Sequence, residues 1–338
     1  MNYVNQWSNN LALGAEIDAP LPKWVEDYLC DVITSFHTNS EPSMGDSSDT
    51  SEAVFRTLIG HRYNYLSRGR SMEYRDRVMP WINEAVQANE PVRFYYDLGG
   101  GYRASLRPGK QPVTFSVGLG EFLALRQIAL FCNELRGCYP PQAHFWIVID
   151  NLCAYFTNDI PIEETRGYAK ELRRLIAELG LNEYVEVLLE SELFSVEEFR
   201  HEFMTAYTRP KPSRLTPAEY ENVTRFLGRL CEQKEAEARV SRYERASTAT
   251  ECLIAPVIRG VRLTQRATAG TLCFRSFRGG DQRIQSGDLA LSYGPDRSLS
   301  PVLLTSRNVD RYRCLRVPAP DCIPQSVPTI TIARPLAG

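Results

Sequence analysis

The stretch HFWIVID, residues 144–150, is a nearly continuous apolar run that ends in an acid. Such a run is typical of a parallel strand that is buried on both faces of a sheet. Two β-rich runs lie on either side of it, VRFYYDL at 92–98 and EYVEVLL at 183–189, and helical periodicity fills the gaps at 119–137 and 161–180. This alternation predicts right-handed crossovers and an α/β fold with a Rossmann-like, mainly parallel sheet flanked by helices.

The chain of 338 residues changes character toward both ends. The polar, small residues at 38–52 indicate a mobile loop after an N-terminal helical piece. Residues 215–246 open with a capping box and predict a long helix. From 250 to 334, short β-prone runs such as CLIAPVI, DLALSY and TITIAR predict extra strands, at least partly antiparallel. We therefore expect an N-terminal helical segment and loop at 1–54, an α/β core at 55–214, and a long helix plus a β-rich C-terminal extension of the same domain at 215–338.

The composition favours a small-molecule ligand over nucleic acid or a membrane surface. The formal net charge is -2 and the isoelectric point is near 6.2, so no general electrostatic attraction to polyanions is expected. The first ten residues lack the features of a signal peptide, and no apolar run approaches the ~18 residues that span a bilayer. We expect a cytoplasmic protein. Nine scattered cysteines without a C-x-x-C pair, and only four histidines, favour reduced buried thiols over a protein-ligated metal site.

Ligands of open parallel sheets bind beyond the carboxyl ends of the strands. The first β-rich run ends at Asp97 and leads into LGGGYRASLRPGK, residues 98–110, and the second ends at Asp150. If the two strands are neighbours, both loops share one rim of the sheet. Glycines let backbone N–H groups approach an anion, and arginines chelate phosphate oxygens, so the rim is a candidate sugar-phosphate cradle. Its phosphate-binding residues would be Gly99, Gly100, Gly101, Arg103 and Arg107; the alternative is a surface loop whose arginines face water.

The loop at 98–110 partly matches two nucleotide-binding motifs. A Walker A loop is excluded, because Ala104 and Gln111 stand where it needs glycine and a hydroxyl residue. The D-x-G-x-G motif of S-adenosylmethionine-dependent methyltransferases fits Asp97 to Gly101. However, Arg103 replaces a third glycine, and prolines delay the helix that should follow. A methyltransferase that uses the Asp97–Gly101 loop stays an alternative.

From about residue 55 to 190, the chain resembles the pyoverdine/dityrosine biosynthesis family, the isonitrile synthases. EPVRFYYDLGGGYRAS resembles the family's G-E-P-I strand entry and F-P-x-K loop, and GLGEFLALRQIALFCNEL resembles P-D-x-x-E-x-x-A-L. CYPPQAHFWIVIDN resembles Y-P-P-G-A followed by I-V-S-D-G, and VRLTQR at 261–266 is similar to R-L-S-x-H. The matching positions are Tyr102, Arg103, Glu121, Ala124, Leu125, Tyr139, Pro140, Pro141, Ala143, Asp150, Arg262 and Leu263.

The chain departs from the family pattern at several site positions. The family's D-G-R-V-F-x-D reads DNLCAYF here, so Leu152 replaces an arginine and Phe156 replaces an acid. Arg103 stands at the loop lysine, unless Lys110 substitutes for it, and Arg266 stands at the histidine of R-L-S-x-H. The resemblance therefore covers the scaffold more fully than the site.

The resemblance implies a divergent isonitrile synthase-like enzyme of secondary metabolism. Members of the family convert the α-amino group of an amino acid into an isonitrile, take the added carbon from ribulose 5-phosphate, and need no metal. It thus implies ribulose 5-phosphate as co-substrate, no bound cofactor, and partner enzymes such as an iron/2-oxoglutarate oxygenase. A non-catalytic family member that acts as a binding or partner protein is the other hypothesis.

The resemblance also assigns roles to individual residues. Asp150 is the strongest candidate, because an acid after five apolar residues is costly unless it is paired or useful. The implied catalytic residues are Asp150, Glu121 and Arg103, and the implied substrate-binding residues are Tyr102, Lys110, Tyr139, Asn151, Tyr155, Phe156 and Arg262.

Overall fold

The structure is a computed structural model. The residues that it describes are 49–60, 74–97, 117–208, 233–264, 272–273, 288–293, 299–304 and 311–336, with the single positions 23, 26, 27, 30, 217, 220, 221 and 224. No helix within this part of the chain is long and apolar enough to cross a membrane.

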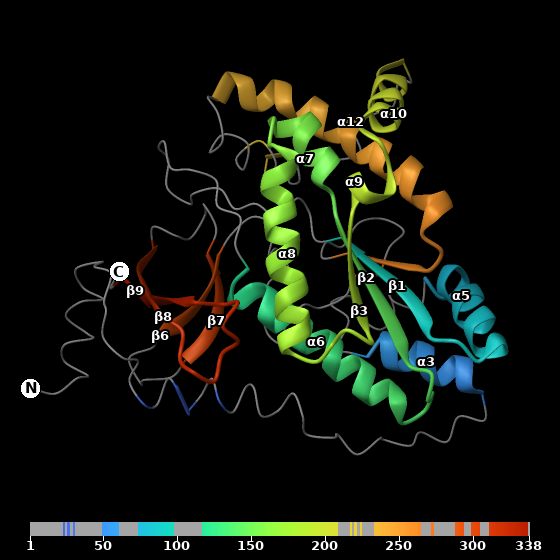
Figure 1. The fold of residues 1–338 in the computed structure, drawn as a ribbon, viewed down its shortest axis with the longest axis horizontal. Helices are drawn as coiled ribbons and strands as arrows, with labels where there is room; N and C mark the ends of the chain where they lie inside the picture. The colour runs from blue at the N-terminus through green and yellow to red at the C-terminus, as the bar shows by residue number, and fades with distance from the viewer. Residues whose placement is uncertain are drawn as a thin grey trace, which may run out of the picture.

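A five-stranded sheet forms the centre of the molecule (Figure 1). Every neighbouring pair of strands in it is parallel, which confirms the α/β fold class. Along the sheet the order is β3-β2-β1-β4-β5, so the direction of strand addition reverses at β1. The strands are β1 (Val92–Asp97), β2 (Ala143–Ile149), β3 (Val185–Leu189), β4 (Val261–Thr264) and β5 (Leu272–Cys273).

One face of this sheet packs against four helices to form the main core. Phe94 of β1 stacks on Phe145 of β2 with ring centroids 5.1 Å apart, and Phe131 meets both rings edge-on. Three of these helices bury one side, as helical periodicity predicts, whereas the helix Leu119–Arg136 is buried on almost all sides. These helices are α3 (Thr50–Leu58), α5 (Arg75–Ala88), α6 (Leu119–Arg136) and α8 (Ile162–Glu178).

A second apolar cluster covers the other face near the carboxyl ends of the strands. It joins Val148 of β2 to Phe199 and Phe203 and to Ala246 and Ala249. Figure 1 shows one of its helices, α12, crossing the end of the sheet at which α7 and α9 begin. Among the described residues, the helices at this end are α7 (Asn151–Asn158), α9 (Glu190–Leu193), α10 (Val196–Thr208) and α12 (Gln233–Val257).

A separate four-stranded sheet makes up the C-terminal part, in the order β7-β6-β9-β8. Two of its strand pairs are antiparallel and one is parallel, so the expected β-rich, partly antiparallel extension is confirmed. Leu291, Leu315 and Ile332 of this sheet belong to the same core as α6, and Figure 1 shows the sheet beside α6 and α8. Its strands are β6 (Asp288–Tyr293), β7 (Leu299–Leu304), β8 (Tyr312–Pro318) and β9 (Thr329–Pro335).

The structure corrects one boundary of the long helix. The CLIAPV segment was expected to be β-prone, but residues 252–257 form the last part of α12. The expectation was wrong because Ala246, Ala249 and Ile254 lie on one helical face and are buried in the second cluster. Tertiary packing of this face outweighs the weak local preference for a strand.

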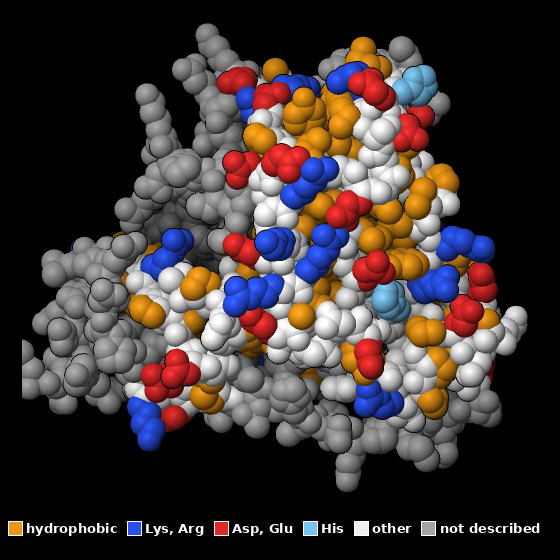
Figure 2. All heavy atoms as spheres, viewed as in Figure 1, with side chains coloured by type: hydrophobic (Ala, Val, Ile, Leu, Met, Phe, Trp, Pro, Cys, Tyr) orange, Lys and Arg blue, Asp and Glu red, His pale blue; other side chains and the backbone are white. Residues whose placement is uncertain are grey.

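The outer face of α8 carries charges of both signs. Arg166 pairs with Glu163 and Arg174 with Glu178 along the helix. Figure 2 shows basic and acidic side chains interspersed over the middle of this face of the molecule. The surface of α8 is therefore a solvated face stabilised by local ion pairs, each of small energy.

Candidate functional site

A pocket of about 240 Å³ lies against β1, β2 and β4, beneath α12. The strand order reverses at β1, and open parallel sheets bind ligands in the crevice at such a reversal. Tyr95 of β1 and Arg262 of β4 are register partners, so their side chains project from the same face of the sheet. The lining residues are Tyr95, Val148, Asp150, Thr250, Glu251, Ile254, Ala255 and Arg262.

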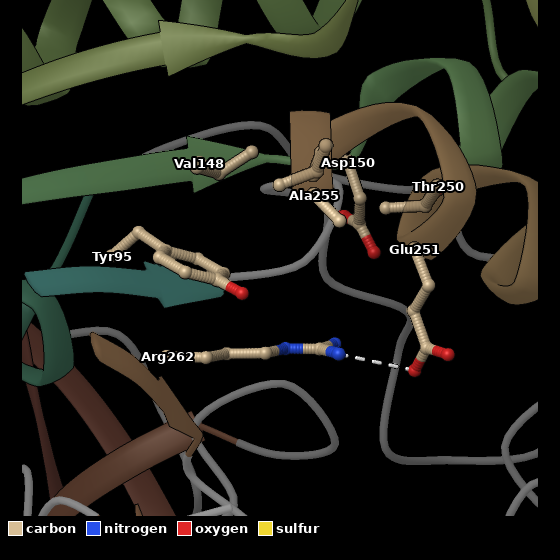
Figure 3. Close-up of a pocket in the computed structure, with 8 residues that line it drawn as sticks. Tyr95, Val148, Asp150, Thr250, Glu251, Ala255 and Arg262 are labelled. Carbon is tan, nitrogen blue, oxygen red and sulfur yellow. Dashed lines mark hydrogen bonds and ion pairs between the residues drawn. The ribbon is translucent and has the colours of Figure 1, made fainter. Parts of the chain in front are cut away.

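The Asp150 carboxylate faces this pocket. Asp150 occupies the N-cap position of α7, but its side chain makes no capping hydrogen bond. The backbone N–H of Cys153, in the first turn of α7, instead donates to Oε2 of Glu190 at 2.9 Å. Because Glu190 satisfies the helix end, Asp150 can turn toward the cavity, as Figure 3 shows.

Glu190 connects two walls of the pocket. It follows the last residue of β3 and is fully buried. Its Oε1 accepts a hydrogen bond from the hydroxyl of Thr250 on α12, while its Oε2 holds α7. A buried carboxylate with two donors of this kind fixes α7 and α12 relative to each other.

An ion pair joins β4 to α12 at the pocket. Nη1 of Arg262 lies 3.1 Å from Oε1 of Glu251, and both side chains are partly exposed, at 28% and 34%. Figure 3 shows the Tyr95 hydroxyl and the Arg262 guanidinium extending from the strands toward the carboxylates of Asp150 and Glu251. The pocket thus offers groups for acid–base chemistry and for holding a charged ligand.

The far end of α7 is also held by α12. Arg242 donates through Nε to the carbonyl of Phe156 at 3.0 Å and lies 3.1 Å from the Asp159 carboxylate. Arg239 donates to the carbonyl of Asn158 at 3.3 Å. Cations at a helix C-terminus satisfy its last carbonyls, so both ends of α7 are fixed by residues distant in the sequence.

Two predicted site residues are placed away from the pocket lining. Glu121 is buried in the first turn of α6, where its carboxylate accepts from the Gly118 N–H at 2.8 Å and the Tyr168 hydroxyl at 3.2 Å. Tyr139 precedes the amino end of β2, and its hydroxyl donates to the carbonyls of Ala85 and Glu90. Burial, with the nearby Glu90 charge, raises the pKa of Tyr139.

Three other predicted residues on α7 make contacts with neighbouring helices. Asn151 is buried and exchanges two hydrogen bonds with Ser191 of α9, at 2.8 and 3.0 Å. Phe156 packs on Phe199 of α10 with ring centroids 5.1 Å apart, and Tyr155 is 38% exposed beside it. Among the predicted positions that the structure describes, Asp150 and Arg262 are the two brought together in the pocket.

Several predicted positions lie outside the described residues. The backbone of β1 is described to Asp97, and β1 pairs with β2, which ends at Ile149 directly before Asp150. This confirms that the chain leaves both strands at one rim of the sheet. The remaining assignments stay predictions. They are Gly99, Gly100, Gly101, Tyr102, Arg103, Arg107, Lys110 and Arg266.

Glu190, Thr250 and Glu251 are pocket or supporting residues that the sequence did not single out. Glu190 had a usable signal, because it follows the apolar run VEVLL just as Asp150 follows WIVI. Thr250 and Glu251 had none, since they lie in the middle of a helix whose position over the sheet is a tertiary property.

The fold is that of a Rossmann-like α/β protein, and its pocket lies at the strand-order reversal, where such folds bind ligands. Residues 115–252 match the model of the family described as pyoverdine/dityrosine biosynthesis protein. The structure is also similar to the crystal structure of the PvcA protein from Pseudomonas aeruginosa, with a TM-score of 0.62 and 17% identity over 84% of this chain and 99% of that chain. The middle of the chain therefore matches the family that its sequence motifs predict, and the fold is similar to that of PvcA.

Similarity to other solved structures is weaker. The tyrosyl-tRNA synthetase of Archaeoglobus fulgidus is 12% identical, with a TM-score of 0.39 over 67% of this chain and 63% of that chain. The enzyme of Aeropyrum pernix is 12% identical, with a TM-score of 0.34 over 64% of this chain and 53% of that chain. No curated protein sequence matches the chain.

Proposed function

We propose that this chain is a biosynthetic enzyme of the isonitrile synthase type, which modifies the amino group of an amino acid or related amine and uses ribulose 5-phosphate as co-substrate. The match of residues 115–252 to the pyoverdine/dityrosine biosynthesis family supports a biosynthetic role. The single observation that carries the proposal is the position of Asp150. It lies at the carboxyl end of β2, is released from capping α7, and faces the pocket.

Asp150 is suited to start the reaction. An amine is protonated at neutral pH and must lose a proton before its nitrogen can attack a carbonyl carbon. In the proposed step, the Asp150 carboxylate accepts this proton and the amine adds to the ketone of the sugar phosphate. Loss of water from the adduct then leaves an imine. The phosphate would be held by Arg103, Arg107, Lys110 and the glycines that follow β1.

The changed family positions support a site built around Asp150. Leu152, at the family's arginine position, is fully buried in the second apolar cluster. Phe156, at the position of the second acid, packs between Phe199 and Phe203. Both side chains have packing roles in this chain, so the proposed acid–base work rests on Asp150.

The test is turnover by the full-length protein. Ribulose 5-phosphate and a panel of amino acids and amines are supplied together, and mass spectrometry follows products that need the sugar phosphate. Asp150→Asn should lower kcat by about 100-fold or more, the usual contribution of a general base. Arg103→Ala should raise KM for ribulose 5-phosphate. Glu163→Gln, an exposed change on α8, serves as the control.

No sugar-phosphate-dependent product with any amine, together with no thermal shift on adding ribulose 5-phosphate, would contradict the proposal. If amines bind without turnover, the chain acts as a non-catalytic binding protein. An iron/2-oxoglutarate oxygenase encoded next to this chain would support the same type of metabolism.

A second candidate function is methyl transfer from S-adenosylmethionine. The observation that favours it is the end of β1 at Asp97, where the strand order reverses and nucleoside ligands bind in related folds. Binding of S-adenosylhomocysteine that Asp97→Ala abolishes would support this candidate, and no binding would exclude it.

A further inference from the structure

Three arginines gather at one end of the C-terminal sheet, outside the pocket. Strands β8 and β9 (Figure 1) are antiparallel, and Arg313 of β8 lies directly opposite Arg334 of β9. Arg311 directly precedes β8, and its carbonyl accepts a hydrogen bond from the Leu336 N–H at 2.8 Å, so the pairing extends to this position. Because side chains alternate along a strand, Arg311, Arg313 and Arg334 project from the same face of the sheet.

This basic cluster, Arg311 with Arg313 and Arg334, has no acidic partner in the described part of the chain. All three side chains are exposed, and none makes an ion pair or a side-chain hydrogen bond there. The nearest described acid along β8, Asp321, lies in the loop at the other end of the two strands. Like charges directly opposite each other on neighbouring strands are destabilising, so the Arg313–Arg334 pair lowers the stability of the sheet.

Protection of a sheet edge does not account for the cluster. Among the described strands, β8 is an edge strand, and charged side chains on an edge discourage pairing with other chains. This role explains arginines on β8. Arg334, however, lies on β9, which pairs with β6 on one side and with β8 on the other. A second positive charge opposite Arg313 therefore needs another explanation, and an anionic ligand supplies one.

We propose that Arg311, Arg313 and Arg334 form a binding site for a multivalent anion of the phosphate or diphosphate type. Guanidinium groups stay charged at any physiological pH and bind phosphate oxygens with two parallel hydrogen bonds. The Cβ atoms of opposed residues lie about 4.5–5.5 Å apart, and positions two residues apart on a strand about 7 Å, so long side chains from all three positions can reach one anion. A bound anion replaces the repulsion with attraction. The site shares no residue with the pocket and does not depend on the proposed function.

Calorimetric titration of the full-length protein with inorganic pyrophosphate at low ionic strength tests the proposal. Arg313→Gln and Arg334→Gln should each weaken binding at least about tenfold, the effect of losing a hydrogen bond between charged groups. The matched control is Arg316→Gln. It removes the same charge from the same strand, but on the other face, where the register partner is Thr331. The control should change the affinity by less than about twofold, because salt screens a charge that does not contact the anion.

Charge reversal at Arg334 gives a second measurement with the opposite sign. Without pyrophosphate, Arg334→Glu places an acid opposite Arg313 and should raise the midpoint of thermal unfolding. Adding pyrophosphate should raise the midpoint of the wild-type protein but not that of this variant. An arginine with only a structural role would show the reverse, a lower midpoint after substitution and the same response to pyrophosphate as the wild type.

Three results would overturn the proposal. The first is that the wild-type protein binds no pyrophosphate at low ionic strength. The second is that Arg316→Gln weakens binding as much as Arg313→Gln does, which would show general charge attraction. The third is that Arg313→Gln and Arg334→Gln both keep the wild-type affinity, which would place the anion elsewhere, such as the glycine-rich loop that follows β1. Circular dichroism confirms that each variant is folded.

Discussion

Asp150 and Glu190 are both acids that follow apolar strands, but the structure uses them differently. Glu190 accepts hydrogen bonds from the Cys153 N–H and the Thr250 hydroxyl and is fully buried. Asp150 stands at the N-cap of α7 and lines the pocket. The availability of one carboxylate for a ligand therefore depends on the structural role of the other.

Glu190→Ala should weaken both the fold and the pocket. Two buried donors lose their acceptor, which should lower the free energy of unfolding by about 2 kcal/mol. Asp150 is then the nearest carboxylate to the open end of α7, and we expect it to turn from the pocket to cap the helix. Urea unfolding measures the first effect, and a loss of amine affinity measures the second.

Two further variants, one at Glu190 and one at Glu192, separate the effect on stability from the effect on the pocket. Glu190→Gln retains one acceptor oxygen and should restore part of the amine affinity. Glu192→Ala removes a partly exposed carboxylate on the same short helix, where it accepts from Arg173 and the Leu189 N–H, and should leave amine affinity unchanged. Wild-type amine affinity in Glu190→Ala would show that Asp150 keeps its position without Glu190.

At the scale of the elements, the short connection between α12 and β4 positions Arg262 in the pocket. α12 supplies Thr250 and Glu251, and β4 supplies Arg262 only a few residues later. Gly260 lies between them, and a Cβ at this position would approach the carbonyl oxygen of Arg93 in β1 to 2.6 Å. This close approach lets β4 pair with β1 directly after the helix.

Gly260→Ala should therefore push β4 away from β1. A forced contact of this kind typically costs about 1–3 kcal/mol, so we expect a lower midpoint of thermal unfolding and weaker amine binding. Gly167→Ala is the matched control, because a Cβ there meets nothing within 4 Å on the exposed side of α8. It should stabilise the protein by about 0.4–1 kcal/mol. Equal unfolding midpoints for Gly260→Ala and the wild type would contradict the steric argument.

At the scale of the whole molecule, the C-terminal sheet is joined to the α/β core by packing and by polar contacts. Glu178, the last residue of α8, accepts hydrogen bonds from the N–H and the hydroxyl of Ser326, at 3.1 and 2.6 Å. Arg174 pairs with the same carboxylate at 2.8 Å. Partial burial disfavours the charged form, but these donors outweigh it and hold the pKa of Glu178 below its usual value.

This contact should make stability sensitive to acid. Because the pKa is lower in the folded state, the stabilisation is full above the usual glutamate value near 4.5 and is lost as the pH falls through the folded-state pKa. Glu178→Gln should cost about 1 kcal/mol at pH 7, the net value of a typical hydrogen bond, and nothing at low pH. Urea unfolding between pH 7 and pH 3 measures this.

Ser326→Ala should lower the free energy of unfolding by part of the amount that Glu178→Gln does. The double variant should lower it by less than the sum of the two single changes. Additive losses at pH 7, or a difference between Glu178→Gln and wild type that does not shrink in acid, would show that this contact is energetically unimportant.

The sequence by itself determined the parallel sheet and the edge at which its ligand site lies. Strands buried on both faces read as apolar runs, the helices between them read as amphipathic, and both signals are local. Since parallel neighbours end at one edge, the position of Asp150 on the rim followed from the same pattern. Helices α7, α9 and α10 and strands β4 and β8 are not predicted, because each is short or weakly periodic.

Only the tertiary structure decided which side chains meet at that rim. Glu121 and Asn151 match what a site requires in residue type, yet they cap and connect helices. Arg262 meets Glu251 and faces Asp150 because β4 returns to pair with β1. Glu190 reaches α7 because β3 pairs with β2. Strand order and register bring together residues that are far apart in the sequence. Local sequence patterns do not predict these contacts.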